Sequence, residues 1–121
     1  MKTAIRCLFM LAISTGLQVT SAGGAFLSGN DLYGRLKDYT SGAVRNVTSA
    51  SSGFGFVIGV SDVMDGKLDP STGYKFCLPN QVTAGQLTDV TIRFLEKKPE
   101  LRHLSAYSLV ENALADSFPC P

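Results

Sequence analysis

The most regular pattern in the chain is a pair of stretches near its C-terminal end in which apolar residues recur every three or four positions, as in amphipathic helices. The first helix is expected to begin at Thr83, because Thr83 and Gln86 have the spacing of a capping box. Val82 and Leu87 have the spacing of a hydrophobic staple around the same start. The face then continues through Val90, Thr91, Phe94 and Leu95. Pro99 is expected to end this helix.

The second stretch runs from about Ser105 to Phe118, and its apolar stripe consists of Ala106, Leu109, Val110, Ala113 and Leu114. A short turn, Pro99–Leu104, joins the two helices, so we expect them to lie antiparallel with their stripes in contact. That arrangement brings Cys77, before the first helix, close to Cys120, after the second. We therefore expect a disulfide between them, which stabilises by roughly 4 kcal/mol in the loop-entropy model. Two free buried thiols are the alternative.

A third, shorter helix is expected after Phe26, near the start of the domain. Ser28 or Asn30 can cap it. Its narrow apolar face consists of Leu32, Leu36 and Tyr39. The following segment, residues 40–52, is rich in Ser, Thr, Gly and Asn, which predicts a loop that passes into another helix.

Residues 54–64 form the most apolar stretch of the domain, and their periodicity fits a buried strand or a buried helix. Gly55 and Gly59, four positions apart, would let a helix approach a neighbour closely, and Asp65-Gly66 is typical of a helix end. We favour a central helix from about Val47 to Asp65, packed by the other helices. The segment 67–76, with two turn-forming residues, is predicted to be an exposed loop.

The chain of 121 residues is predicted to form one domain behind a secretory signal. Lys2 and Arg6 precede a short apolar run, residues 7–16, and small residues at 20–25 fit a cleavage site. We expect a signal peptide over residues 1–22, with cleavage as late as 25, and a single helical domain over residues 23–121. The apolar run is shorter than the about 20 residues that a membrane span needs, and an uncleaved anchor is the alternative.

Removal of this leader changes the charge and the cysteine count. The number of Lys and Arg residues falls from 11 to 9, against 10 acidic residues, so charge gives no reason to expect binding to nucleic acid or to an anionic membrane. Loss of Cys7 leaves an even pair, Cys77 and Cys120. A paired cysteine count behind an export signal is typical of proteins in oxidising compartments.

The residue types that carry out catalysis do not form a recognisable site. His103 is the only histidine, which excludes a His-rich metal centre, and no Gly-x-Ser-x-Gly elbow is present. Asp62, Asp65 and Asp69 do not have the spacing of an EF-hand loop. We therefore expect no enzymatic activity, no cofactor and no metal ion, and we expect a protein whose surface binds another molecule.

Several short motifs resemble the periplasmic immunity proteins of the Rap/Tai type. In the C-terminal half these motifs are Cys77-Leu78-Pro79, Val82-Thr83-x-Gly85-Gln86-Leu87-x-Asp89-Val90, Phe94-Leu95, Pro99-Glu100-x-Arg102-His103-Leu104, Ser108-Leu109-Val110 and Phe118-Pro119-Cys120. Upstream they are Phe26-Leu27-Ser28-Gly29-Asn30-x-Leu32 and Gly55-Phe56-Val57-x-Gly59-Val60. The resemblance extends over nearly the whole mature chain, and the C-terminal motifs are its specific part.

This resemblance implies an all-α, disulfide-linked bundle of four to five helices that forms a homodimer in the periplasm. It also implies a function without chemistry of its own. Such a protein binds a peptidoglycan-cleaving amidase delivered by a type VI secretion system and covers the active-site cleft of that enzyme. The producing cell and its siblings are thereby protected.

Three positions depart from the family pattern. Family members commonly carry a further cysteine pair at the positions of Leu36 and Gly53, and the joint absence of both cysteines here implies that they pair with each other elsewhere. Ser105 stands where the family often has proline, and a serine can cap the last helix instead.

Contacts with the partner are expected from exposed loops, which commonly carry function. The candidate contact residues are Lys67, Tyr74 and Lys75 in the long loop and Glu100, Arg102 and His103 in the turn between the last two helices. Tyr and Arg are enriched among the residues that dominate interfaces. The alternative for Tyr74 is burial against the core, and the alternative for Arg102 and His103 is capping of helix carbonyls.

Two other functions compete with the immunity hypothesis. A small exported helical chaperone or stress protein would have the same size and a disulfide, but a single histidine argues against a strong acid switch. An accessory subunit of an envelope complex is the third possibility. A homodimer is expected because few short helices leave apolar surface uncovered, above all at residues 54–60.

Overall fold

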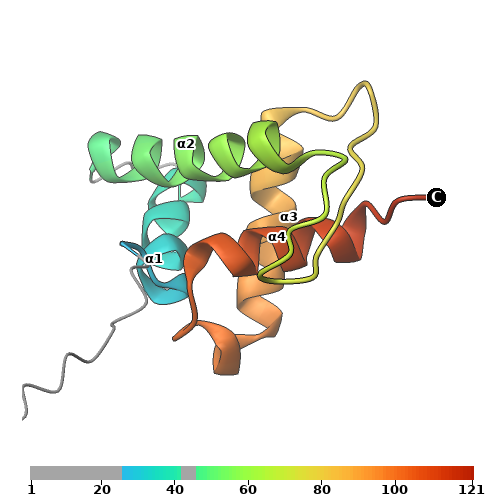
Figure 1. Ribbon diagram of the computed structural model, residues 1–121. Coiled ribbons are helices and arrows are strands. Elements are labelled where there is room, and N and C mark those ends of the chain that lie inside the picture. Colours follow the sequence, from blue (N-terminus) through green and yellow to red (C-terminus); the bar gives the residue numbers. More distant parts are fainter. Residues whose placement is uncertain (1–25, 42–45) are drawn as a thin grey trace, which may run out of the picture.

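The computed structural model describes residues 26–41 and 46–121, which form a helical bundle (Figure 1). The elements are α1 (Gly29–Thr40), α2 (Val47–Met64), α3 (Ala84–Lys97), a short 3-10 helix η1 (Pro99–Leu101) and α4 (Ala106–Ser117). The part of the chain that the structure describes contains no strand, so the predicted all-α class is confirmed. The predicted signal peptide lies outside the described residues.

The helices begin where the polar residues of the sequence can satisfy the free N–H groups of a first turn. Ser28 and Asp31 form a capping box at α1, with the Asp31 N–H donating to Ser28 Oγ over 3.2 Å. Thr83 and Gln86 form the predicted box at α3, where the Thr83 N–H donates to Gln86 Oε1 over 2.8 Å. Ser105 occupies the N-cap position of α4 but makes no capping hydrogen bond, so the predicted serine cap is wrong.

All four α-helices contribute to one core. Its fully buried apolar side chains include Leu32 and Leu36 of α1, Val57 of α2, Leu95 of α3, and Val110 and Leu114 of α4. The apolar stripes predicted for α3 and α4 are therefore the faces that these helices bury. Phe76 joins the core from the long loop between α2 and α3, and its burial contributes roughly 1.5–3 kcal/mol.

Helices α1 and α2 approach each other closely at Gly53. A Cβ atom built at Gly53 would lie 2.8 Å from the Cβ of Arg35 and 3.2 Å from Cδ2 of Leu36. Gly55 and Gly59 have open space around them instead, so the prediction that these two glycines permit close packing is wrong within the chain. The two positions at which family members are expected to carry paired cysteines, 36 and 53, lie against each other.

The disulfide between Cys77 and Cys120 is present, as predicted, with an S–S distance of 2.06 Å. The geometric reason given for it is wrong, because α4 crosses α3 in Figure 1 rather than lying antiparallel beside it. The long loop returns the chain to the end of α4 instead. There the Cys77 N–H donates to the Phe118 carbonyl over 2.9 Å, which places the two cysteines together.

Among the described residues, α2 is the only helix long and apolar enough to cross a membrane by length and composition. The core helix of a soluble protein meets the same criterion. Only 28% of α2 is buried, although the sequence predicts a central helix surrounded by the others. Its outer side therefore carries apolar and small residues at the surface.

Candidate partner-binding surface

The turn between α3 and α4 is attached to the start of α1 by three backbone hydrogen bonds. The Gly29 N–H donates to the Leu104 carbonyl over 2.8 Å, and the Asn30 N–H donates to the Arg102 carbonyl over 2.8 Å. The Ala106 N–H donates to the Leu27 carbonyl over 2.9 Å. A turn fastened at both sides in this way presents its outward side chains in a fixed arrangement.

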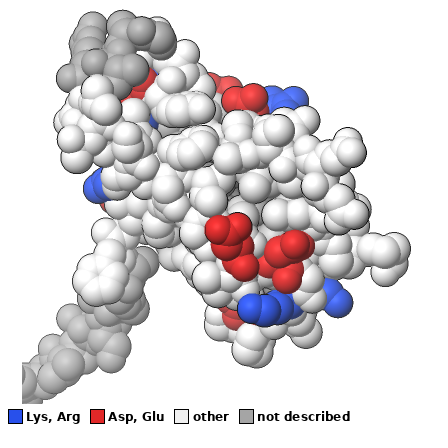
Figure 2. All heavy atoms as spheres, turned by 90° about the horizontal axis from the view of Figure 1, so that it is seen from above, with Lys and Arg blue, Asp and Glu red and all other residues white. Residues whose placement is uncertain are grey.

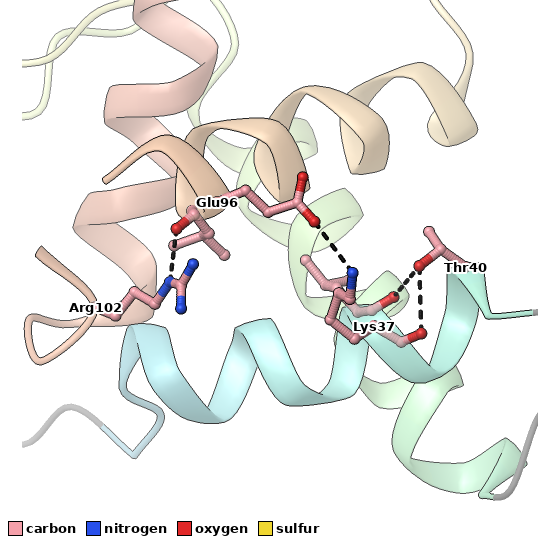
Figure 3. Close-up of polar contacts among 6 residues, drawn as sticks. Lys37, Thr40, Glu96 and Arg102 are labelled. Carbon is pink, nitrogen blue, oxygen red and sulfur yellow. Dashed lines mark hydrogen bonds and ion pairs between the residues drawn. The ribbon is translucent and has the colours of Figure 1, made fainter. Parts of the chain in front are cut away.

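Arg102 is engaged within the fold. Its Nε donates to the Leu95 carbonyl over 2.6 Å at the end of α3 (Figure 3). Its guanidinium lies 3.8 Å from the centre of the Tyr33 ring. These contacts satisfy a carbonyl that α3 leaves free and add a cation–π interaction. The sequence-based alternative for Arg102, capping of a helix carbonyl, therefore describes its position in the structure.

Glu100 and His103 lie at the surface of the same turn. His103 Nδ1 is 2.9 Å from the Glu100 carbonyl oxygen, and both side chains are exposed. Nearby, Lys37 of α1 and Glu96 of α3 form an ion pair of 3.2 Å on the surface (Figure 3). Because both of its side chains are about half exposed, this pair contributes little to stability. Glu100 is therefore exposed at the turn, whereas the ring of His103 contacts a carbonyl of η1, as its sequence-based alternative describes.

The long loop between α2 and α3 carries the other three candidate residues. Lys67 is exposed, and its Nζ donates to the Val63 carbonyl over 2.7 Å, where its charge suits the C-terminal end of α2. Lys75 is exposed and Tyr74 is half-buried. The structure therefore presents two lysines from this loop to a partner, with Tyr74 partly covered between them.

The two groups of candidate residues do not form one cluster. Within the ranges 26–41 and 46–121, no hydrogen bond or ion pair joins the loop group to the turn group. Figure 1 shows the long loop passing along α4, whereas the turn lies beyond the N-terminal end of that helix. A partner that touches both groups must therefore extend along α4.

Sequence reasoning missed a buried polar cluster that attaches the long loop to α4. Tyr107 Oη lies 2.5 Å from Asp69 Oδ2 and 3.1 Å from Glu111 Oε1, and the Thr72 hydroxyl donates to Glu111 Oε2 over 2.8 Å. Asp69 also accepts hydrogen bonds from the backbone and side chain of Ser71. The only local signal is the Tyr107–Glu111 spacing, which places an acid beside the apolar stripe of α4.

The two acids of this cluster have opposite electrostatic surroundings. The Ser71 and Tyr107 hydroxyls that donate to Asp69 lower the pKa of its carboxyl to about 2. Burial raises the pKa of Glu111, whose side chain is only 1% exposed. Burial and the two acids also raise the pKa of Tyr107. The predicted loop is therefore exposed at its lysines but buried where Asp69 and Phe76 lie.

A hollow lies between α3, the end of the long loop and the end of α4. It has a volume of about 650 Å³ and is lined by α3 and by the segments 79–82 and 117–118. Asp89 and Arg93 of α3 give it one charge of each sign, with Val90 beside them. None of the predicted contact residues lines it, so we call this feature the α3 groove and treat it as a separate surface.

The described residues contain no group of three His, Cys, Asp or Glu side chains placed to hold a metal ion.

Fold and surface together define a small, disulfide-fastened helical protein that offers loops and a groove to a partner. The sequence signature of the Rap1a immunity proteins matches residues 28–120. The chain therefore belongs to the Rap1a family, whose members are type VI secretion immunity proteins that bind a toxic effector. A comparison with curated proteins found no match.

Proposed function

We propose that this protein acts in the periplasm, where it binds a secreted peptidoglycan amidase and covers the active-site cleft of that enzyme. The observation that carries the proposal is the family match, which extends over the whole described domain from α1 to the disulfide. A bridge between Cys77 and Cys120 also supports the location, because disulfides persist in oxidising compartments. Inhibition in this proposal is steric and needs no catalytic group.

Two exposed regions are proposed to reach the amidase, one in the long loop and one in the turn beyond the N-terminal end of α4. Lys67 and Lys75 of the long loop form the first, and Glu100 and His103 of the turn form the second. Both regions are fastened to the fold, by the buried cluster and by the backbone bonds to the start of α1 respectively. Loops that are already ordered in the free protein lose little conformational entropy on binding, which favours tight inhibition.

Capture followed by inhibition tests this proposal. The oxidised protein, immobilised and exposed to secreted and periplasmic extract, should retain a peptidoglycan amidase, and adding the protein should abolish the release of peptide from peptidoglycan. Retention of no amidase would overturn the choice of partner. Retention of many unrelated unfolded proteins would instead identify a chaperone.

Three surface variants locate the contact. The double variant Lys67→Glu/Lys75→Glu should bind the amidase more weakly than the native protein. The double variant Glu100→Lys/His103→Ala should do the same. The matched control exchanges the two charges of the α3 groove, Asp89→Lys with Arg93→Glu, and should bind as the native protein does. If the control alone loses binding, the groove is the contact and the loops are not.

We further propose that the protein forms a homodimer through the outer face of α2. This face carries Gly55 and Gly59, which have open space around them, and the exposed side chains of Asp62 and Val63. Figure 2, seen from the side of α2, shows a broad uncharged area that is bordered by acidic and basic side chains. The glycines permit close approach of the helix backbones, and two copies can meet here when the Asp62 side chains lie at the edge of the contact.

Sedimentation at micromolar concentration tests the dimer. Gly59→Arg should shift the native protein from dimer to monomer, because it places a bulky charge on the proposed face. Gly34→Arg is the matched control, since Gly34 of α1 is also exposed and has no atom within 4 Å of an added Cβ. A monomeric native protein, or a dimer that survives Gly59→Arg, would contradict the proposed interface.

A further inference from the structure

The buried cluster of Asp69, Thr72, Tyr107 and Glu111 joins two parts of the chain that are distant in sequence. Thr72 and Glu111 are separated by 39 residues, and Asp69 and Tyr107 by 38. Asp69 and Glu111 are 6% and 1% exposed. The cluster therefore attaches the middle of the long loop to the buried side of α4, away from solvent.

The hydrogen-bond donors of the cluster are enough for only one ionised acid. Asp69 Oδ1 accepts from the backbone N–H and the hydroxyl of Ser71, over 2.7 and 2.6 Å. Asp69 Oδ2 lies 2.5 Å from Tyr107 Oη, so the single phenolic proton points to Asp69. Asp69 thus has the donors of a carboxylate, as its lowered pKa of about 2 also indicates.

Glu111 is left with one full donor, the Thr72 hydroxyl at Oε2. Its other oxygen, Oε1, lies 3.1 Å from Tyr107 Oη, whose proton is already directed to Asp69. A protonated Glu111 can place its proton between these two oxygen atoms and complete the hydrogen bond. An ionised Glu111 would lack that bond and would face the negative Asp69 in a part-buried site.

No cation offsets the charge that an ionised Glu111 would carry. In the described part of the chain, neither an ion pair nor a hydrogen bond connects Glu111 to a Lys, Arg or His. The groups that act on its ionisation are Asp69 and Thr72 of the loop and Tyr107 of α4 itself. Helices α1, α2 and α3 contribute no titratable group to the cluster.

We propose that Glu111 is a neutral carboxylic acid in the folded protein, donating its proton to Tyr107 Oη while Tyr107 donates to the Asp69 carboxylate, and that this proton-holding clasp fixes the long loop on α4. Glu111 keeps its proton at pH values at which exposed glutamates have ionised. Ionisation of Glu111 at higher pH breaks one bond of the clasp and adds a second negative charge, which loosens the loop.

The sign of the pH dependence follows from the raised pKa of Glu111. The unfolded chain loses the Glu111 proton at about the ordinary value of 4.5, whereas the folded protein holds it longer. The clasp therefore contributes its full stability below pH 4.5 and loses it as the pH rises through the folded pKa. The state of Glu111 does not depend on which partner the protein binds, so it is tested on the protein alone.

Carbon-13 NMR of the glutamate carboxyl groups tests the protonation state directly. In the folded full-length protein, the Glu111 carboxyl carbon should titrate at higher pH than the carboxyl carbon of exposed Glu100 in the same spectra. Glu111→Gln assigns the signal. Titration of Glu111 together with Glu100, or at lower pH, would overturn the proposal.

Stability and hydrogen exchange provide the second readout. Glu111→Gln replaces the neutral acid by a neutral amide that can donate to Tyr107 and accept from Thr72. The free energy of unfolding of Glu111→Gln should therefore match the native value at pH 4.5 and exceed it increasingly at higher pH. Glu100→Gln is the matched control and should follow the native pH profile. The amide of Gly73, which donates to the Asp69 carbonyl over 2.8 Å, should lose protection as pH rises in the native protein but not in Glu111→Gln.

A Glu111→Gln protein that is less stable than the native protein across this range would show that the carboxylate form holds the loop, and would overturn the clasp. If Glu111→Gln does not fold, the carboxyl titration of the native protein still decides the question.

Discussion

Replacing Gly53 by alanine is expected to push α1 and α2 apart. The added methyl group would lie 2.8 Å from the Cβ of Arg35, a contact shorter than real Cβ atoms make. It would also lie 3.2 Å from Cδ2 of Leu36, which is fully buried and has no free space into which it can turn. Because Arg35 meets the methyl through its Cβ, which moves only with the backbone, the helices themselves must shift.

The expected free energy change has two parts of opposite sign. Alanine in place of glycine within a helix stabilises by about 1 kcal/mol through its higher helix propensity. Overpacking of a close contact costs about 1–3 kcal/mol. Gly34→Ala in α1 provides the first part alone, because no atom lies within 4 Å of a Cβ at that position. Gly53→Ala should therefore be less stable than Gly34→Ala by about 1–3 kcal/mol.

Urea unfolding followed by circular dichroism measures both variants against the native protein at equal concentration. We expect Gly34→Ala to shift the midpoint upward and Gly53→Ala to leave it unchanged or shift it downward, with unchanged slopes. Equal midpoints for the two variants would refute the reasoning, because they would mean that α1 and α2 do not meet closely at Gly53.

Three further predictions concern the disulfide, the turn and the acid range. Replacing Cys77 and Cys120 together by alanine should lower the free energy of unfolding by about 4 kcal/mol, and reduction of the native protein should lower it similarly; a loss below about 1 kcal/mol would contradict the loop-closure account. Arg102→Ala should cost about 1–3 kcal/mol, because it removes a charged hydrogen bond at the end of α3 and the contact with the Tyr33 ring; Arg102→Lys should recover only part of that loss in thermal unfolding. Folding lowers the pKa of the Asp69 carboxyl from 3.8 to about 2. The carboxylate therefore contributes stability that is complete above pH 3.8 and is lost as the pH falls through 2. Asp69→Asn should abolish that loss in acid titrations followed by fluorescence or circular dichroism.

The helices and their starting points could be predicted because their determinants are local. Thr83 and Gln86 are three residues apart, and the same is true of Ser28 and Asp31, so each capping box can be recognised within one turn. The central helix predicted from Val47 to Asp65 ends within a residue of the observed one. Periodicity and capping depend on neighbours in sequence, which a single sequence contains.

The position of the close contact between α1 and α2 could not be predicted in this way. Gly53, Gly55 and Gly59 lie on the same helix, and their spacing does not reveal which of them another helix covers. The answer depends on the path of α1, which packs Arg35 and Leu36 against Gly53 and leaves the other two glycines open. The crossing of α3 and α4 was missed for the same reason, since their apolar stripes fit more than one crossing angle.

The sequence could predict the surface position of the charged candidate residues, and their contact with a partner stays a prediction. Lys67, Lys75 and Glu100 lie at the surface, as expected for charged side chains in loops. The internal role of Arg102 depends on Tyr33, which lies far away in sequence, and the cluster of Asp69 with Glu111 depends on the return of the loop to α4. Such contacts between distant residues leave no local pattern.

The most direct test of the immunity function is a titration of a type VI peptidoglycan amidase, recovered from the producing cell's secreted fraction, with the oxidised protein. Peptide release from purified peptidoglycan is measured at each ratio. The steric account predicts a linear fall in activity that reaches zero at one binding site per amidase molecule, with the amidase itself left intact. Full activity in the presence of a molar excess of the protein, with no complex on gel filtration, would contradict it.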